Sequence, residues 1–382
     1  MRLQQLATIR RTTHTRSMPI DTSSDFGAAP TPVTDAASRS ISLADVASLA
    51  GVSAGTVSRA LSRPDMISEA TRTRVLEAAD RLGYVANGAA RALASRRTRT
   101  VGAIVPRYGG SSFPTMVQGL ESTLASQGYT LLLSAPEHGR AHEPGILRAL
   151  LERGGDAVAL LGDEHPPQLF ATLAASRTPF VMMWAQPDAQ GTCVGFDEHE
   201  AAALIVDHLA GLGHQRIGFI GGRTSSNERA RRRLRGLTLA IAKCGMTLSE
   251  RALIEIEYGF REGFDAMARI VADGLDVSAV VCGNDYLAAG ALSALDHAGI
   301  RVPGTVSIAS FNDNDFAPFL HPPLTTVRLP IREIGEQAGR YLLARLGGEA
   351  PPPAYVQPVQ LMARRSTGPA PEAYVTGDYA YP

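Results

Sequence analysis

The first periodic pattern of hydrophobic and polar positions in the chain begins at Ser42. Asp45 follows three residues later, a spacing close to the capping box that opens a helix. Apolar residues then recur at helical intervals until Gly51, a common residue just past a helix end. The pattern predicts three short helices, at 43–50, 54–61 and 69–84, the last burying Val75, Leu76, Ala79 and Leu82. Three such helices with a tight glycine turn between the first two form a helix-turn-helix bundle.

Beyond about Val101 the pattern changes to short apolar runs that alternate with amphipathic stretches. The runs are bounded by Gly, Pro or Asp and lie at 101–106, 129–135, 157–162, 179–185, 216–222, 278–285 and 306–313. Such alternation predicts doubly wound parallel sheets with helices on both faces. It continues for about 265 residues, more than one sheet accommodates comfortably, so we expect two α/β lobes. Ligands of such sheets bind outside the carboxyl ends of the strands.

Composition changes this picture only locally. The formal net charge is zero, so the whole chain has no excess of positive charge for a polyanionic partner. Residues 87–100 differ, because they carry Arg91, Arg96, Arg97 and Arg99 and no acidic residue. The three cysteines lack paired or metal-type spacing, which fits a reducing compartment. No apolar run approaches the roughly 18 residues of a membrane span, and no secretory signal is recognisable. We expect a cytoplasmic protein with no membrane contact.

The segments DVASLAGVSAGTVSRAL (45–61) and TRTRVLEAADRLGYVANGAARALAS (71–95) resemble the DNA-binding head of the LacI-type repressor family, over about residues 41–97. The resemblance implies that the second helix lies in the major groove of double-stranded DNA. Arg59 would address a guanine, which contributes about 1–3 kcal/mol of discrimination, and Ala54 would contact a thymine methyl group. The implied DNA-binding residues are Ser53, Ala54, Gly55, Thr56, Ser58, Arg59, Asn87, Ala90 and Leu93.

The resemblance also makes residues 87–98 a hinge helix and linker. Leu93 would enter a central base step in the minor groove as an apolar wedge, and contacts on the bent DNA would offset the unstacking. The alternative is that Leu93 packs within a linker, but the basic run around it favours contact with phosphates. Because two hinge helices fill one minor-groove site, we expect a homodimer on a pseudo-palindromic operator.

The rest of the chain resembles the periplasmic-binding-protein-like core of the same family, in VGFDEHEAA, GHQRIGFIGG, RRRLRGL, GNDYLAAGAL and PPLTTV. Lobe one would comprise about 99–197 and a return segment near 328–341, and lobe two mainly 198–325. The domains expected are a disordered tail (1–40), the helix-turn-helix domain (41–86), the hinge helix and linker (87–98), the two-lobed effector-binding and dimerisation domain (99–365) and a second disordered tail (366–382). The nominated effector-binding residues are Phe113, Trp184, Asp197, Arg233, Tyr258, Asn284, Asp285 and Asn312.

Arg233 is the main candidate for gripping an effector hydroxyl or carboxylate, since a planar guanidinium suits both. Its alternative is a surface charge among neighbouring arginines, and for Phe113 and Tyr258 core packing competes with ligand contact. Many relatives have Tyr-Asp where this chain has Phe311-Asn312, and an amide carries no charge to repel an acidic ligand. The substitution and the arginines favour a sugar acid such as gluconate.

These features predict a sequence-specific transcriptional regulator, a repressor by resemblance, whose operator affinity is controlled by a small effector. One alternative keeps the DNA-binding head but has a non-sugar or a protein effector. The other is an α/β enzyme, which is disfavoured because the sequence has no GxSxG, GxxxxGK[ST] or HExxH motif. The acid–histidine runs at 163–165 and 197–200 lack ligand spacing, so we expect no metal and no cofactor.

Overall fold

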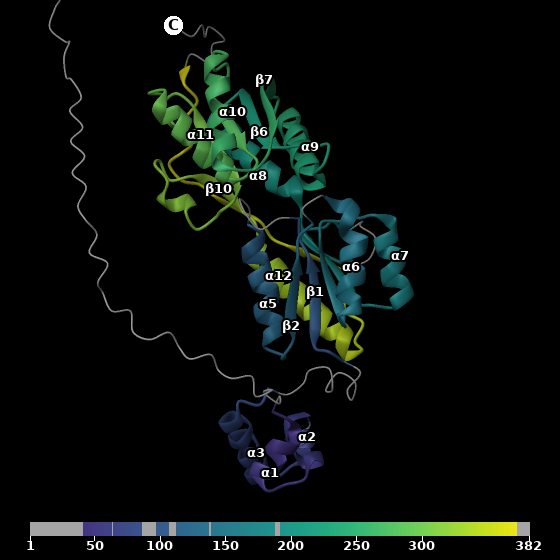
Figure 1. The fold of residues 1–382 in the computed structure, drawn as a ribbon. Coiled ribbons are helices and arrows are strands. Elements are labelled where there is room, and N and C mark those ends of the chain that lie inside the picture. Colours follow the sequence, from purple (N-terminus) through teal and green to yellow (C-terminus); the bar gives the residue numbers. More distant parts are fainter. Residues whose placement is uncertain are drawn as a thin grey trace, which may run out of the picture. The chain divides into compact units, whose positions relative to one another are not determined.

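The computed structural model describes residues 41–62, 64–85, 97–106, 112–136, 139–187 and 192–372 (Figure 1). The chain divides into two compact units, residues 1–86 and 87–382. The expected tail 1–40 and all but the last two residues of the expected hinge 87–98 lie outside the described residues.

The first unit is a bundle of the helices α1 (Leu43–Ala50), α2 (Ala54–Ser62) and α3 (Glu69–Leu82), with the 3-10 helix η1 (Pro64–Met66) before α3. The predicted capping box is present, because Ser42 N donates to Asp45 Oδ2 at 2.8 Å and Asp45 N donates back to Ser42 Oγ. Leu76 was expected in the core but is 39% exposed, and Ala78 is buried instead. Positions 75, 78, 79 and 82 share one helical face, whereas 76 lies off it.

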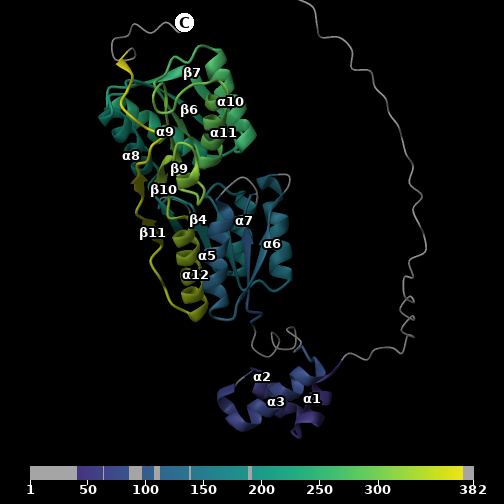
Figure 2. The same cartoon turned by 90° about the vertical axis from the view of Figure 1, so that its left-hand side faces the viewer.

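Lobe one is built on a sheet with the strand order β11-β5-β4-β3-β1-β2, in which every neighbouring pair is parallel. The strands are β1 (Thr100–Ile104), β2 (Thr130–Ser134), β3 (Ala157–Leu161), β4 (Phe180–Met183), β5 (Cys193–Phe196) and β11 (Ala354–Gln357). Helices α5 (Phe113–Ala125) and α12 (Ile331–Gly347) pack on one face, and α6 (Glu143–Glu152) and α7 (Pro167–Ser176) on the other (Figures 1 and 2). A Cβ at Gly335 would overlap the Met116 carbonyl oxygen, so glycine permits the close approach of α12 to α5.

Lobe two is built on a sheet with the order β12-β10-β9-β8-β6-β7, parallel except for β12. Its strands are β6 (Arg216–Gly222), β7 (Thr247–Ile256), β8 (Ala279–Cys282), β9 (Ser307–Asn312), β10 (Thr325–Arg328) and β12 (Gln360–Met362). Helices α8 (Glu198–Gly211) and α9 (Glu228–Lys243) cover one face, and α10 (Phe260–Ala272) and α11 (Asp285–His297) the other. Two doubly wound lobes confirm the predicted fold class.

The chain passes between the lobes three times: near Asp197, between β10 and α12, and between β11 and β12. The return to lobe one is longer than the predicted 328–341, because α12 continues to Gly347 and β11 then joins the sheet of lobe one. No helix in the described part of the chain combines the length and the apolar character that crossing a membrane requires.

The predicted tail from 366 onwards is wrong over its first residues. Ser366 is fully buried and its Oγ donates to the Ile308 carbonyl at 2.6 Å, while Ala370 N donates to the Leu212 carbonyl at 2.8 Å. The small residues and prolines here read as unstructured, but these bonds fix 366–372 against lobe two. Residues 373–382 lie outside the described part.

Candidate effector cavity and DNA-reading helix

Helix α2 carries the residues that sequence reasoning assigned to base reading. Val57 and Ala60 face the core of the bundle, and the other side of the helix exposes Ala54, Gly55, Ser58 and Arg59. Gly55 lies next to the arginine, and a Cβ there would be in ordinary contact with Arg59 Nη2 at 3.9 Å. The local fold therefore gathers the predicted base-reading positions on one exposed face.

Ser53 has a structural use, because Thr56 N donates to Ser53 Oγ at 3.1 Å and the two hydroxyl oxygens lie 2.9 Å apart. This is an N-cap of α2, as expected from the sequence. Asn87, Ala90 and Leu93, assigned to the hinge, lie outside the described residues. The DNA contacts of all these residues stay a prediction.

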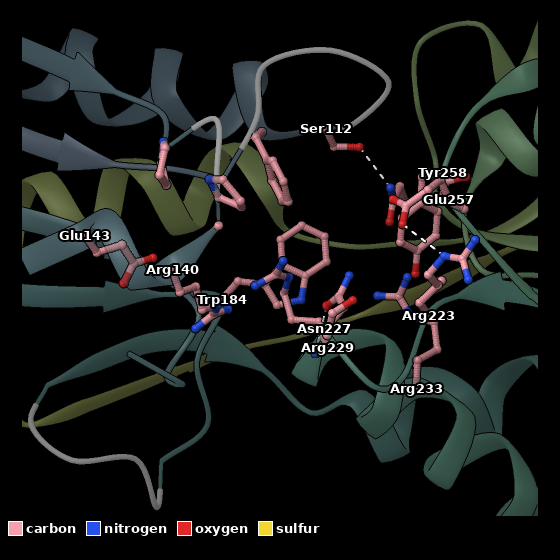
Figure 3. Close-up of a pocket in the computed structure, with 18 residues that line it drawn as sticks. Ser112, Arg140, Glu143, Trp184, Arg223, Asn227, Arg229, Arg233, Glu257 and Tyr258 are labelled. Carbon is pink, nitrogen blue, oxygen red and sulfur yellow. Dashed lines mark hydrogen bonds and ion pairs between the residues drawn. The ribbon is translucent and has the colours of Figure 1, made fainter. Parts of the chain in front are cut away.

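A cavity of about 430 Å³ opens between the two lobes (Figure 3). Six of the eight nominated effector residues line it, namely Phe113, Trp184, Arg233, Tyr258, Asn284 and Asn312. Most of them follow or end strands: Trp184 comes after β4, Tyr258 after β7, and Asn312 ends β9. The cavity thus lies at the carboxyl ends of both sheets, where such folds bind ligands.

The lobe-one wall of the cavity is aromatic. The Phe113 and Trp184 rings meet edge to face with centroids 5.9 Å apart, and Phe196 supports Trp184 from behind at 5.5 Å. The indole Nε1 donates to Glu198 Oε1 at 3.0 Å, which fixes the ring orientation. A fixed aromatic face of this kind suits an apolar face of a sugar ring.

Arg233 lines the cavity, but its charge is already paired. Its Nε and Nη2 donate to the two oxygens of Glu198 at 3.1 Å each, and Nη1 donates to the Gly283 carbonyl at 2.5 Å. Burial would lower the pKa of the guanidinium, yet the charge of Glu198 holds that pKa above its ordinary value. Arg233 keeps N–H groups for a ligand hydroxyl, whereas Glu198 opposes a second carboxylate beside it.

Asp197 and Asp285 do not line the cavity. Asp197 caps α8, its Oδ1 accepting from His199 N at 2.7 Å. Asp285 is fully buried and accepts from Ser310 Oγ at 2.5 Å, Thr326 Oγ1 at 2.8 Å and Asn314 N at 2.6 Å. Burial raises the pKa of Asp285 to about 6 although these hydrogen bonds lower it. Asp285 is used up by the fold and Asp197 caps a helix, so neither carboxylate lies at the cavity wall as the sequence predicted.

Asn312 places an amide group at the cavity wall. Its backbone has a φ of 112°, and its Nδ2 donates to Ser112 Oγ at 2.9 Å. Its Oδ1 is buried and has no hydrogen-bond partner among the described residues. A buried unpaired acceptor at a cavity wall is satisfied by a ligand that donates a hydrogen bond, such as a sugar hydroxyl.

Sequence reasoning missed several residues of the cavity wall, chiefly Arg140, Glu143, Asn227 and Arg229. Arg140 bonds Glu228, which is 88 positions away in the chain, and no local pattern signals such a pair. Glu198 was passed over in favour of Asp197, which ends the strand-like VGFD. The helix turn after the strand directs Glu198, not Asp197, towards Arg233.

Two family models match the chain. Residues 42–87 match the bacterial regulatory proteins of the lacI family, and residues 206–367 match a periplasmic binding protein-like domain. The first match covers the helix-turn-helix bundle, and the second covers most of lobe two and the return through lobe one.

Curated relatives are similar over most of the chain. The HTH-type transcriptional repressor PurR of Photobacterium profundum is 31% identical over 79% of this chain and 91% of its own length. The HTH-type transcriptional repressor CytR of Escherichia coli is 33% identical over 80% and 89%. The HTH-type transcriptional regulator MalR of Streptomyces coelicolor is 34% identical over 86% and 97%.

Solved structures agree with this likeness. A lac repressor dimer bound to operator and the anti-inducer ONPF superposes with a TM-score of 0.76 at 26% identity, covering 86% of this chain and all of that one. The transcription regulator GntR from Chromobacterium violaceum has a TM-score of 0.66 at 33% identity, covering 70% of this chain and 99% of that one. By sequence and by fold, the chain belongs to the lacI family of bacterial regulatory proteins and is a transcriptional regulator, not an enzyme.

Proposed function

We propose that the protein is a repressor that binds a pseudo-palindromic operator as a homodimer, and that a sugar-class effector in the interlobe cavity sets its operator affinity. The observation that carries the effector class is the cavity wall itself. Trp184 and Phe113 offer aromatic surface, while the unpaired Oδ1 of Asn312 and the remaining N–H groups of Arg233 offer hydrogen bonds to hydroxyls.

Relatives support the two halves of this proposal. PurR and CytR are repressors, and the lac repressor structure is a dimer on its operator. A structure of the regulator CelR in complex with cellobiose, 30% identical to this chain with a TM-score of 0.63, covers 85% of this chain and 99% of that one. A regulator that binds chromosomal DNA works in the cytoplasm, and there we place this protein.

Lobe two carries a surface suited to a second copy of the chain. Phe319 is 78% exposed and Phe260 is 51% exposed. Phe260, Tyr286 and Phe316 contact one another with ring centroids 4.9–5.9 Å apart. Exposed aromatic patches of this kind commonly lie at protein interfaces. We assign this patch, formed by Phe260, Tyr286, Phe316 and Phe319, to the homodimer contact.

Selection of binding sites from random duplex DNA by the purified full chain tests the DNA-binding part. We expect two inverted half-sites, with binding that weakens steeply as salt rises because phosphate contacts release counterions. Failure to enrich any symmetric site, with or without metabolites, would refute the operator proposal.

A panel of neutral sugars, sugar alcohols and sugar acids, added to the protein–operator complex, then tests the effector class. A coupling of about 1–3 kcal/mol changes operator affinity roughly 5- to 150-fold. If no member of the panel changes the affinity, the alternative of a non-sugar or protein effector is favoured.

A further inference from the structure

We infer that Arg140 and Arg229, which share the carboxylate of Glu228, form an anion subsite in the cavity wall, so that the effector is a sugar acid gripped there and not at Arg233. The inference rests on the proposed function and names the chemical class of its effector. The subsite consists of Arg140 from lobe one and Glu228 and Arg229 from the first turn of α9 in lobe two.

The charges of this group do not balance. Arg140 Nη2 binds Glu228 Oε2 at 2.6 Å, and Arg229 Nη1 binds Glu228 Oε1 at 2.7 Å. One carboxylate, 1% exposed, therefore serves two guanidiniums and has both of its oxygens occupied. Burial lowers the pKa of Arg229, Glu228 opposes this shift, and the positive charge of Arg140 adds to it. These three residues together carry one excess positive charge, which a ligand anion would neutralise.

The other arginines of the cavity differ because each has a carboxylate of its own. Arg233 is paired with Glu198, and Arg223 with Glu257 at 3.3 Å at the exposed rim. Only in the Arg140–Glu228–Arg229 group, within the described wall, do two guanidiniums share a single acid.

Arg140 also has a free donor. Its Nη1 is buried and finds no hydrogen-bond partner among the described residues. A carboxylate accepts from such N–H groups in a hydrogen bond between two opposite charges. A hydroxyl forms a weaker hydrogen bond, because only the guanidinium is charged. The unpaired nitrogen therefore favours an acid over an alcohol at this position.

Three neighbouring residues, Gly162, Phe113 and Glu143, surround the subsite. A Cβ at Gly162 would overlap Glu228 Oε1, so glycine at this position lets the shared carboxylate sit close to lobe one. The guanidinium of Arg229 lies 5.4 Å from the centre of the Phe113 ring. Glu143, a carboxylate that also lines the cavity, binds His165 Nδ1 through its Oε2 at 2.7 Å.

The two lobes contribute opposite sides of the subsite. Arg140 stands in the 3-10 helix η2 (Arg140–His142) of lobe one, and Arg229 in α9 of lobe two (Figure 3). A carboxylate held by both would bind more tightly to the closed arrangement than to one with the lobes apart, and so would shift the equilibrium towards closure.

Calorimetry with matched ligand pairs tests the inference on the full chain. D-gluconate and D-glucitol differ only in a carboxylate against a hydroxymethyl group, and D-glucuronate and D-glucose form a second such pair. We expect the acid of a pair to bind at least about tenfold more tightly, the worth of one charge-assisted hydrogen bond. Arg140→Gln breaks the bridge to Glu228 as well, so it should weaken the neutral member as Arg232→Gln does, but it should weaken the acid further and so remove the preference, and Arg140→Lys should keep part of it.

Arg232→Gln is the matched control. Arg232 lies in the same helix turn and bridges the lobes to Asp163, but it does not line the cavity. Its loss should weaken both members of a pair equally, because it loosens the lobes and its ion pair is with Asp163 instead of a residue of the subsite. An equal affinity for acid and alcohol in the wild type, or an unchanged acid preference in Arg140→Gln, would overturn the inference while leaving a sugar sensor in place.

If no sugar or sugar acid binds, the proposed effector class is refuted but the anion subsite is not. Sulfate then tests the subsite by itself. Thermal unfolding in sodium sulfate and in sodium chloride of equal ionic strength then compares the wild type with Arg140→Gln and Arg232→Gln. A sulfate-specific rise in Tm that Arg140→Gln lacks and Arg232→Gln keeps supports the anion subsite. The same rise in all three proteins refutes it.

Discussion

Arg59 is exposed on α2 while Val57 packs into the bundle core on the opposite face, so its guanidinium is accessible for the predicted contact with one base. We expect Arg59→Ala to cost about 1–3 kcal/mol of discrimination at one base pair of the selected operator. Fluorescence anisotropy on the operator and on its single-base variants measures this. Arg74→Ala, an exposed arginine of α3, serves as control and should not relax the preference at any one position. An unchanged base preference in Arg59→Ala would contradict the reading role.

The Arg233–Glu198 pair is nearly solvent-free, with side chains 4% and 1% exposed. Removing one member leaves the other charge buried, so Arg233→Gln should lower the free energy of unfolding by about 3–5 kcal/mol. The double variant Arg233→Gln/Glu198→Gln should lose less than the sum of the two single variants. Urea denaturation of the four proteins measures the coupling, and additive losses would show that the pair contributes nothing jointly.

Asp285 should make stability depend on pH. Its pKa of about 6 in the folded chain exceeds its ordinary value of 3.8, so the folded state binds this proton more tightly than the unfolded state. Its contribution to stability is complete below the unfolded pKa and is lost as pH rises through about 6. We expect the stability of the wild type relative to Asp285→Asn to increase between pH 7 and pH 5. A constant difference across that range would argue against the raised pKa.

Asp285 also shows what the sequence alone could not predict about the cavity. Strand ends correctly predicted that Trp184, Asn284 and Asn312 would line one cavity, because the end of a parallel strand has one location in the fold. They could not distinguish Asn284 from Asp285, its neighbour in the chain. Asp285 turns inward to three donors that come from β9, β10 and the loop between them, and only the folded chain brings those donors together.

At the scale of elements, the C-terminal segment 366–372 acts as a strap on lobe two. Ser366 and Thr367 are buried, and the Gly368 carbonyl accepts from the fully buried His214 at 3.1 Å. Truncation after Arg365 removes these bonds, each worth about 0.5–1.5 kcal/mol, and should destabilise the protein by on the order of 3 kcal/mol. Truncation after Glu372 is the control and should leave Tm unchanged. Equal Tm values for the two truncations would show that the strap is dispensable.

The strands that the hydrophobic pattern predicted are mostly buried within a sheet, whereas strands it missed, such as β7, β11 and β12, lie at sheet edges. All seven apolar runs became strands. Six are mostly buried inside a sheet, which requires apolar residues on both faces, and the seventh, β2, is a partly exposed edge strand. Strand β7 escaped notice because Glu250 and Arg251 interrupt its apolar character at the edge of its sheet, where burial is partial. The edge strands β11 and β12 are short and half exposed, and only pairing across the fold makes them strands.

At the scale of the whole molecule, the aromatic patch of lobe two predicts an assembly that a single substitution can break. Phe319→Arg places a charge within the proposed contact and should weaken self-association by at least about tenfold, since buried unpaired charges at interfaces are costly. Analytical ultracentrifugation measures the change. Leu239→Arg is the matched control, because Leu239 is 54% exposed on α9, on the other side of the sheet. A Phe319→Arg protein that associates like the wild type would move the interface elsewhere.

The three crossings between the lobes have a consequence for how such a sensor can be taken apart or recombined. Neither lobe corresponds to one continuous stretch of gene, because α12 and β11 complete lobe one after the chain has already built most of lobe two. A transplant of ligand preference from another regulator must therefore exchange both lobes as one cassette. Swapping a single lobe would sever three covalent links at once.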